Sequence, residues 1–412
     1  MAKIPKVILL IESSRESGRA MLRGIASYAY HHGPWSFYWE PAGLEKARRK
    51  LGALEADGVI ARDVDMAPRE KGLIRRLPGV VIGHRHKEVP GKANVVTDSA
   101  AVAGMAAEHL MGCGFRHFGF CGYRNTSWSA ARRDVFALKI RKAGFEVRIH
   151  EVHEMRPDKI AQHEKKVRES IIRWLRSVPR PIGLMACNDD LGKEVVEACR
   201  QAGLRVPDDV AIMGADNDEV VCGLSNPPLS SVAINFERAG YEAADVLDRL
   251  MRGARRVPAR IVVHASHVVP RQSTDILAVE DAGLAKALRF IRDHARSGAT
   301  VEATARAAGL SRRVLEKRFR EYLKHSALEE IRRVRTDQIA RMLVETELPV
   351  GQIAETLGFE DVQHVARYFR AGTGLSPLAY RKTHGRKHAG KPHSQTGGSF
   401  SQTGVASGMA VR

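Results

Sequence analysis

Short apolar runs alternate with segments of helical periodicity over the first two thirds of the chain. Residues 4–12 (IPKVILLIE) form a nearly continuous apolar run, which is typical of a strand buried on both faces of a parallel sheet. Further apolar runs predict strands at 35–40, 57–61, 80–83, 117–123, 147–152, 182–187 and 210–216. Segments with helical spacing predict helices at 18–31, 44–56, 66–76, 99–111, 131–143, 159–177 and 190–202. This order predicts βαβ units and a doubly wound parallel α/β sheet.

The pattern changes in the last third of the chain, where only helical periodicity remains. Residues 301–323 and 350–374 are predicted to form helix-turn-helix motifs, joined by a long helix at 326–346. The two motifs superpose, with Gly309 opposite Gly358 and one extra residue in the second turn. A motif that repeats its glycine and apolar positions is a stronger signal than a single occurrence. We therefore expect an all-α domain with two helix-turn-helix motifs.

These patterns divide the chain into four parts. We expect an α/β domain over residues 1–275, a linker over 276–283, the helical domain over 284–384 and a tail over 385–412. The tail is rich in Gly, Ser, Gln and Thr and has neither acidic residues nor periodicity. Such a composition predicts disorder.

Charge is distributed unevenly among these parts. Lysine plus arginine number 66 against 47 aspartate plus glutamate, and this net charge of +19 is typical of proteins that bind nucleic acid or anionic membranes. The helical domain holds 19 basic and 12 acidic residues (+7) in 101 positions, whereas residues 1–283 hold 43 and 35 (+8). This density favours double-stranded DNA as the partner of the helical domain. Without an apolar run of 18 residues or a signal-peptide pattern, we expect a cytoplasmic, nucleoid-associated protein with no membrane partner.

Several polar or aromatic residues lie near the carboxyl ends of the predicted strands, where open α/β sheets bind their ligands. The candidates are Glu12, Trp128, Arg132, Asp189, Asp190 and Asp216. Carboxylates accept hydroxyl hydrogens, an arginine donates to oxygens, and an indole packs on a C–H face, so the set suits a polyhydroxyl ligand. The alternative for each aspartate is a helix N-cap.

Catalytic and cofactor motifs are missing from the sequence. It has no GxSxG, HExxH or GxxxxGK[ST] motif, and the GCG at 112–114 precedes its strand instead of following it. The five cysteines lack CxxC spacing, so we expect structural thiols and no metal, cofactor or catalytic residue. A carbohydrate-acting enzyme with Asp189 and Asp190 as acid and base remains an alternative.

The stretch GLRVPDDVAIMGADND (203–218), with NPPLSSVAINFERAGYEAADVLDRLM (226–251), resembles the effector-binding core of the LacI/periplasmic-binding-protein superfamily. The resemblance covers nearly all of the α/β domain and implies two lobes that close on a sugar. It also implies that Arg132, Asp189 and Asp216 contact this effector. LacI-type repressors begin with a helix-turn-helix, which is missing at the start of this sequence, so we expect the DNA reader elsewhere.

Residues 284–384, which end in GTGLSPLAYRK (372–382), resemble the DNA-binding domain of the AraC/XylS family. The resemblance implies base-facing positions at Arg313, Glu316 and Lys317 in the first recognition helix, and at Val362, Gln363 and Arg367 in the second. Side chains of these types can read base edges in the major groove. We assign to the same surface Ser311, which we also expect to cap its helix, and Arg312, Arg320 and Arg370. Arg320 and Arg370, like Arg381 and Lys382, suit contacts with phosphates.

A sugar-binding domain followed by an AraC-type reader is an order that resembles the family of xylose operon regulators. The resemblance implies a homodimeric activator that responds to D-xylose, binds paired half-sites and contacts RNA polymerase. In this family we expect no charged residue at the position of Asp190. Its additional carboxylate beside the pocket leaves the identity of the sugar undetermined. There are three alternatives. The regulator could respond to another monosaccharide, it could act as a repressor, or the protein could be an architectural DNA-binding protein without sequence preference.

Overall fold

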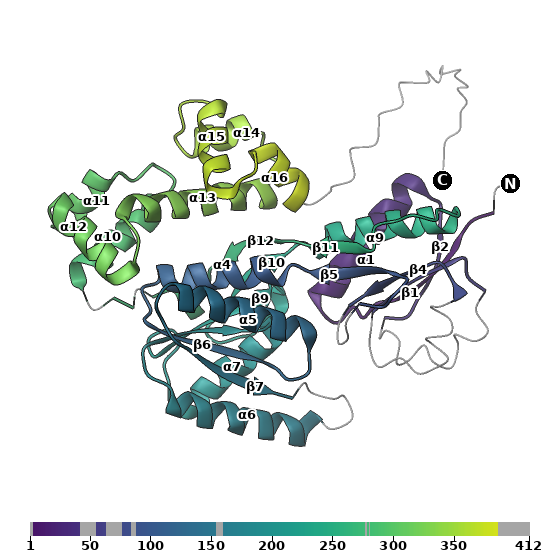
Figure 1. Ribbon diagram of the computed structural model, residues 1–412, viewed down its shortest axis with the longest axis horizontal. Coiled ribbons are helices and arrows are strands. Elements are labelled where there is room, and N and C mark those ends of the chain that lie inside the picture. The colour runs from purple at the N-terminus through teal and green to yellow at the C-terminus, as the bar shows by residue number, and fades with distance from the viewer. Residues whose placement is uncertain are drawn as a thin grey trace, which may run out of the picture.

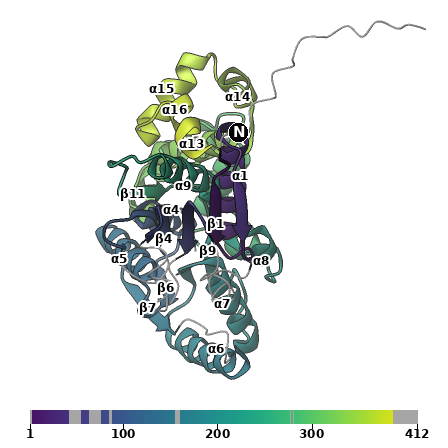
Figure 2. The ribbon, with the colours of Figure 1, turned by 90° about the vertical axis from the view of Figure 1, so that its right-hand side faces the viewer.

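The computed structural model describes residues 3–41, 55–62, 76–83, 88–153, 160–276, 278–279 and 281–385. Two α/β lobes lie side by side, and a helical domain lies over one of them and over the segments that join the two (Figures 1 and 2). The predicted helix at 66–76 and nearly all of that at 44–56 lie outside the described residues, as does the tail from residue 386. None of the helices that the structure describes is long and apolar enough to cross a membrane.

The N-terminal lobe is built on a parallel sheet with the strand order β11-β5-β4-β3-β1-β2. Its strands are β1 (Lys6–Leu10), β2 (Ser36–Trp39), β3 (Gly58–Arg62), β4 (Gly79–Ile82), β5 (Ala93–Thr97) and β11 (Arg260–Val263). Helices α1 (Glu16–His32) and α9 (Phe236–Met251) pack against each other beside this sheet (Figure 1). A Cβ at Gly24 would lie only 1.9 Å from the carbonyl oxygen of Glu237, so the two helices touch backbone to backbone.

The C-terminal lobe contains the second sheet, with the order β12-β10-β9-β8-β6-β7. Its strands are β6 (His117–Tyr123), β7 (Val147–Val152), β8 (Ile182–Ala186), β9 (Val210–Asp216), β10 (Ser230–Ile234) and β12 (Ala265–Val269), of which β12 runs antiparallel to β10. Its helices are α4 (Ser99–Gly112), α5 (Ser127–Lys142), α6 (Ile160–Ser177), α7 (Asp189–Ala202) and α8 (Glu219–Gly223), and the 3-10 helix Gln272–Thr274 follows β12. The predicted two-lobed α/β fold is confirmed.

The chain crosses between the lobes at three places, residues 97–99, 234–236 and 263–265, which we call the hinge. The crossing segments are joined to one another by backbone hydrogen bonds. The N–H of Asp98 donates to Val263 O at 3.0 Å, and the N–H of Asn235 donates to His264 O at 2.9 Å. A change in the angle between the lobes must therefore pass through these segments.

The helical domain consists of two halves joined by one long helix. The first half contains α10 (Ala282–Asp293), α11 (Val301–Ala308), α12 (Arg312–Arg318) and a π-helical turn (Phe319–Leu323), and the second contains α14 (Val350–Thr356), α15 (Val362–Thr373) and α16 (Pro377–His384). The connecting helix is α13 (Ala327–Glu345), which begins with a capping box between Ser326 and Glu329. Each half has its own hydrophobic core, one around Phe319 and one around Phe369. The predicted all-α domain with two helix-turn-helix motifs is confirmed.

Candidate effector pocket and DNA-contacting surface

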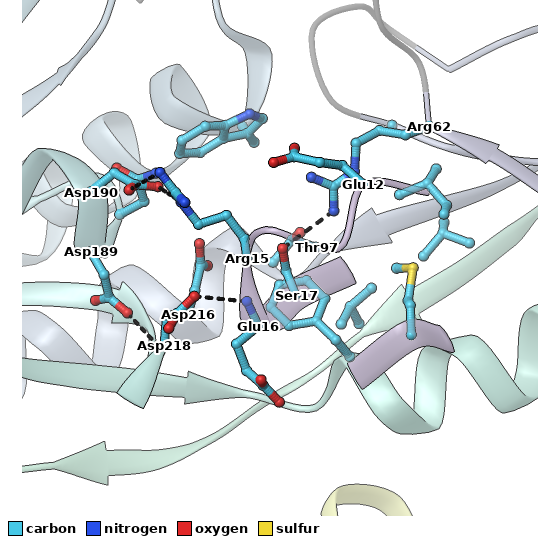
Figure 3. Close-up of a pocket in the computed structure, with 18 of the residues that line it drawn as sticks. Glu12, Arg15, Glu16, Ser17, Arg62, Thr97, Asp189, Asp190, Asp216 and Asp218 are labelled. Carbon is cyan, nitrogen blue, oxygen red and sulfur yellow. Dashed lines mark hydrogen bonds and ion pairs between the residues drawn. The ribbon is translucent and has the colours of Figure 1, made fainter. Parts of the chain in front are cut away.

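A cavity of about 370 Å³ lies between the two lobes, at the carboxyl ends of their parallel strands (Figure 3). Ligand sites typically have volumes of about 300–1,000 Å³. All six residues selected from the sequence line this cavity, namely Glu12, Trp128, Arg132, Asp189, Asp190 and Asp216. The structure thus brings them together, and their contact with an effector stays a prediction.

Asp189 is buried at the first position of α7. Its carboxylate accepts a hydrogen bond from Ser231 Oγ at 2.6 Å and one from the N–H of Asp218 at 2.8 Å. The N-cap of α7 is Asn188, whose side chain accepts from the N–H of Leu191 at 3.1 Å, so Asp189 is not used as the cap. Burial, together with the neighbouring carboxylate of Asp216, raises the pKa of Asp189 well above its usual range.

Arg132 is buried on α5 beside the carboxylate at the end of β9. Its guanidinium donates to Cys187 O and to Asp216 Oδ1 (3.4 Å), and it lies 4.9 Å from the ring centroid of Trp128. Helix α5 begins at Ser127, four residues before the predicted start, which places Trp128 one turn before Arg132. Burial raises the pKa of Asp216, and the charge of Arg132 opposes this effect.

The backbone at the end of β9 is strained. Asp216 has a φ of 104° and Asn217 a φ of 54°, a region that side chains other than glycine rarely occupy. Such residues each cost about 1–3 kcal/mol, and they concentrate where function requires a fixed side chain. This backbone conformation places the Asp216 carboxylate at the edge of the cavity, where it pairs with Arg132.

Asp190 is bound to the opposite lobe. Arg15, at the N-terminus of α1, donates to both of its oxygens, from Nε at 2.9 Å and from Nη2 at 2.8 Å. The adjacent carboxylates of Asp189 and Asp190 therefore have different partners and do not form an acid–base pair. Glu12, across the cavity, accepts a hydrogen bond from Ser14 Oγ.

Three further residues line the pocket but are not among the six effector contacts predicted from the sequence: Arg15, Arg62 and Asp218. Asp218 Oδ1 accepts from the N–H of Val220 (3.1 Å) and so caps α8, while its Oδ2 accepts from the N–H of Glu16 (2.7 Å) in the other lobe. Arg15 and Asp218 follow strands, as the selected residues do, but their partners lie 175 and 202 residues away along the chain. Arg62 ends β3, and only its position at a strand end could have indicated it.

The predicted DNA-contacting residues lie on the exposed sides of two recognition helices. Arg313, Lys317 and Arg320 are exposed, Glu316 is half-buried, and all four line one shallow concavity on the first half. The corresponding residues Val362, Gln363, Arg367 and Arg370 on α15 are exposed as well. DNA contact by these residues stays a prediction.

Three other residues of this region have partners within the helical domain. Ser311 caps α12 as expected, because its Oγ accepts from the N–H of Val314 at 3.3 Å. Arg312 pairs with Glu302 at 2.7 Å while remaining exposed. Arg381, which we assigned to phosphates, is half-buried and donates to the carbonyl oxygens of Leu343 (3.1 Å) and Leu348 (2.6 Å). Its guanidinium fixes the end of α13 through these two bonds, and its contact with a phosphate stays a prediction.

The described part of the chain gives no indication of a metal site or of a reactive thiol. Within the described ranges, no group of three or more His, Cys, Asp or Glu side chains is arranged to hold a metal ion. All five cysteines are buried free thiols. Burial raises the pKa of Cys187 to about 12, which keeps this thiol protonated and unreactive.

Two families of known proteins match the two parts of the chain. Residues 107–274 match a periplasmic binding protein-like domain, and residues 304–383 match a helix-turn-helix domain. Together with the interlobe cavity and the two exposed recognition helices, these matches define a DNA-binding transcription regulator with an effector-binding domain.

Relatives that match over about nine tenths of the chain include regulators of xylose operons. The chain is 27% identical to the xylose operon regulatory protein of Escherichia coli K12, over 91% of this chain and 96% of that protein. It is 26% identical to the xylose operon regulatory protein of Haemophilus influenzae, over 91% and 98%. A solved structure of a xylose-binding transcription activator, xylR, matches with a TM-score of 0.57 and 25% identity, over 93% of this chain and 99% of that one. The predicted resemblance is confirmed, and because these relatives are regulators, the alternative of a carbohydrate-acting enzyme is set aside.

Proposed function

We propose that the protein activates transcription of sugar catabolic genes in response to D-xylose. The effector binds between the lobes, where Arg132 and Trp128 face a ring and Asp189 and Asp216 accept its hydroxyl hydrogens. The observation that carries the proposal is the buried Arg132, held between Asp216 and the indole of Trp128 at the edge of a cavity of about 370 Å³. The names of the relatives favour D-xylose among monosaccharides.

We further propose how the DNA is read. The sensor spans residues 1–275, a linker follows at 276–283, and the reader spans 284–384. Helix α13 has 19 residues, so at about 1.5 Å per residue it is roughly 28 Å long. This length is close to the roughly 34 Å between successive major grooves on one face of DNA. The two recognition helices of one protomer therefore suit adjacent major grooves. The protein acts in the cytoplasm, at the nucleoid, as a homodimer that binds two such pairs of grooves. There it contacts RNA polymerase.

The sugar is tested by isothermal titration calorimetry on the full chain with a panel of pentoses and hexoses. We expect D-xylose to bind with a Kd below 1 mM and the other sugars at least about tenfold more weakly, because unmatched hydroxyls leave buried polar groups unpaired. The Asp189→Asn variant should weaken binding strongly, whereas Glu146→Gln, at an 88% exposed side chain, should not. If the protein binds no monosaccharide at millimolar concentration, the proposal is wrong.

The DNA half is tested by selection from random duplexes, with and without D-xylose. Arg313→Ala should relax preference at one position of the selected site, whereas Arg320→Ala should weaken binding to all sequences alike and reduce its salt dependence. An architectural protein would select no sequence. A reporter gene under the selected site then distinguishes an activator from a repressor by the sign of the response to sugar.

A further inference from the structure

Arg62 lies in the pocket opposite the predicted effector contacts. It is the last residue of β3, and its side chain lies in the cavity beside Glu12, across from Asp189 and Asp190 (Figure 3). Arg132 belongs to the C-terminal lobe, so two arginines from different lobes line the same cavity.

The guanidinium of Arg62 has more donors than the described residues satisfy. Its Nη2 donates to Ser17 Oγ at 3.3 Å, and its buried Nε has no acceptor within the part of the chain that the structure describes. Burial lowers the pKa of Arg62, although the charges of Glu12 and Asp216 act to raise it. A buried cation with unpaired donors is costly, so a further acceptor is expected when the site is occupied.

The charges around the cavity indicate what kind of acceptor is missing. The acidic lining residues are Glu12, Glu16, Asp189, Asp190, Asp216 and Asp218, and the arginines are Arg15, Arg62 and Arg132. Arg15 and Arg132 already pair with carboxylates. An anionic ligand would therefore meet an excess of carboxylates, whereas the hydroxyl and ring oxygens of a neutral sugar accept from a guanidinium without repulsion.

We propose that Arg62 is an effector-binding residue of the N-terminal lobe, which donates from Nε and an adjacent Nη to an oxygen of the bound sugar. This inference rests on the proposed function and adds a second N-terminal-lobe contact to the predicted one at Glu12. A sugar held by Arg62 on one side and by Arg132 and Asp189 on the other connects the lobes, so its binding stabilises the closed cleft.

The test compares D-xylose with its 2-, 3- and 4-deoxy analogues by calorimetry on the full chain. Arg62→Met removes the donors and keeps an unbranched apolar stem, and Arg148→Met, at a 60% exposed side chain on β7, is the matched control. We expect Arg62→Met to weaken D-xylose binding by about 10- to 100-fold, the usual effect of losing a charged hydrogen bond, and the control to stay within about twofold. Wild type should discriminate against one deoxy sugar, and Arg62→Met should lose that discrimination.

A second readout separates ligand contact from a structural role. Because Arg62→Met removes an incompletely paired cation, the Tm without sugar should equal or exceed that of wild type, whereas loss of a structural contact would lower it. If the variant has wild-type affinity, or discriminates against the same deoxy sugar, or has a lowered Tm, Arg62 is not an effector contact. If wild type itself binds no sugar, the proposed function fails instead.

Discussion

The first half of the helical domain rests on the C-terminal lobe far from the hinge, whereas the second half rests on the hinge and on the adjoining start of β12. In the first half, Arg292 donates to Gly112 O at 3.2 Å, and the guanidinium of Arg116 lies 4.7 Å from the ring centroid of Tyr322. In the second half, Tyr380 Oη donates to Ser266 O, and Asn235 Nδ2 donates to the carbonyl oxygens of His384 and Gly385. Figure 1 shows the two halves above these different parts of the sensor.

Two motifs that repeat one another in sequence therefore have different mechanical support. We expect a rotation of the lobes to carry the first half along with the C-terminal lobe, and to move the second half less, because it lies on and next to the segments about which the lobes turn. Helix α13 connects the two, so we expect closure of the cleft to change the angle between the recognition helices. Two helix-turn-helix motifs with similar sequences can therefore respond differently to closure of the cleft.

The largest effect is expected from the buried ion pair beneath the first half. The Glu330 side chain is fully buried and accepts from Arg333 at 3.0 and 2.6 Å. Although burial acts to raise the pKa of Glu330, the charge of Arg333 holds it below the usual range. Glu330→Gln leaves Arg333 without this partner charge and should cost about 3–5 kcal/mol in the free energy of unfolding, measured in urea by circular dichroism.

A matched control for this variant exists on the same arginine. Asp337 also pairs with Arg333, at 3.0 Å, but its side chain is 63% exposed. Asp337→Asn should therefore cost less than about 1 kcal/mol. Equal losses for the two variants would show that the first half is not held by the buried pair.

An intermediate effect is expected at the contact of the second half with the start of β12, next to the hinge. Tyr380→Phe keeps the ring against Phe369 and removes the hydrogen bond to Ser266 O. At about 1 kcal/mol, its loss should reduce the ratio of DNA affinities with and without D-xylose by about fivefold, with the sugar Kd unchanged. Arg116→Met, which removes the ring contact of the first half, should change this ratio less. The reverse order would contradict the role assigned to the hinge.

At neutral pH the smallest effect is expected from two buried histidines beside the same contacts, because their effect on stability develops only as the pH falls. Burial lowers the pKa of His384, beside the hinge, to about 4, and that of His109, beside Arg292, to about 3. Since an unfolded histidine titrates near 6.5, stability contributed by His384 should be complete above this pH and decline as the pH falls toward 4. His384→Gln should flatten the decline of Tm between pH 6.5 and 4, while a variant of the exposed His117 should follow wild type. A His384→Gln curve parallel to that of wild type would refute this assignment.

The fold was predictable where the sequence has local signals. The strands at 147–152 and 210–216 were predicted to the residue, because each lies between two segments of helical periodicity, the first as a mixed apolar and polar stretch and the second as an apolar run. The strands β11 and β12 were not predicted. They have four and five residues, lie at the edges of their sheets and follow one another with only His264 between them, so they lack the alternation with helices on which the prediction depended.

The pocket was predictable in part for a similar reason. Arg132, Asp189 and Asp216 could be found because they lie near strand ends within one lobe. The pair between Arg15 and Asp190 depends on how closely the lobes approach, which no local pattern encodes. The bond from Arg381 to the carbonyl oxygen of Leu343 in α13 was not predicted, because an exposed arginine and one that folds back onto a helix end have the same spacing in the sequence.

The double use of Asp218 has a consequence for the protein without sugar. One carboxylate caps α8 in the C-terminal lobe and neutralises the positive end of α1 in the other. Opening the cleft must separate the Asp218 carboxylate from the N-terminus of α1. This contact therefore favours the closed cleft even without a ligand. We therefore expect the level of gene expression without sugar to depend on Asp218.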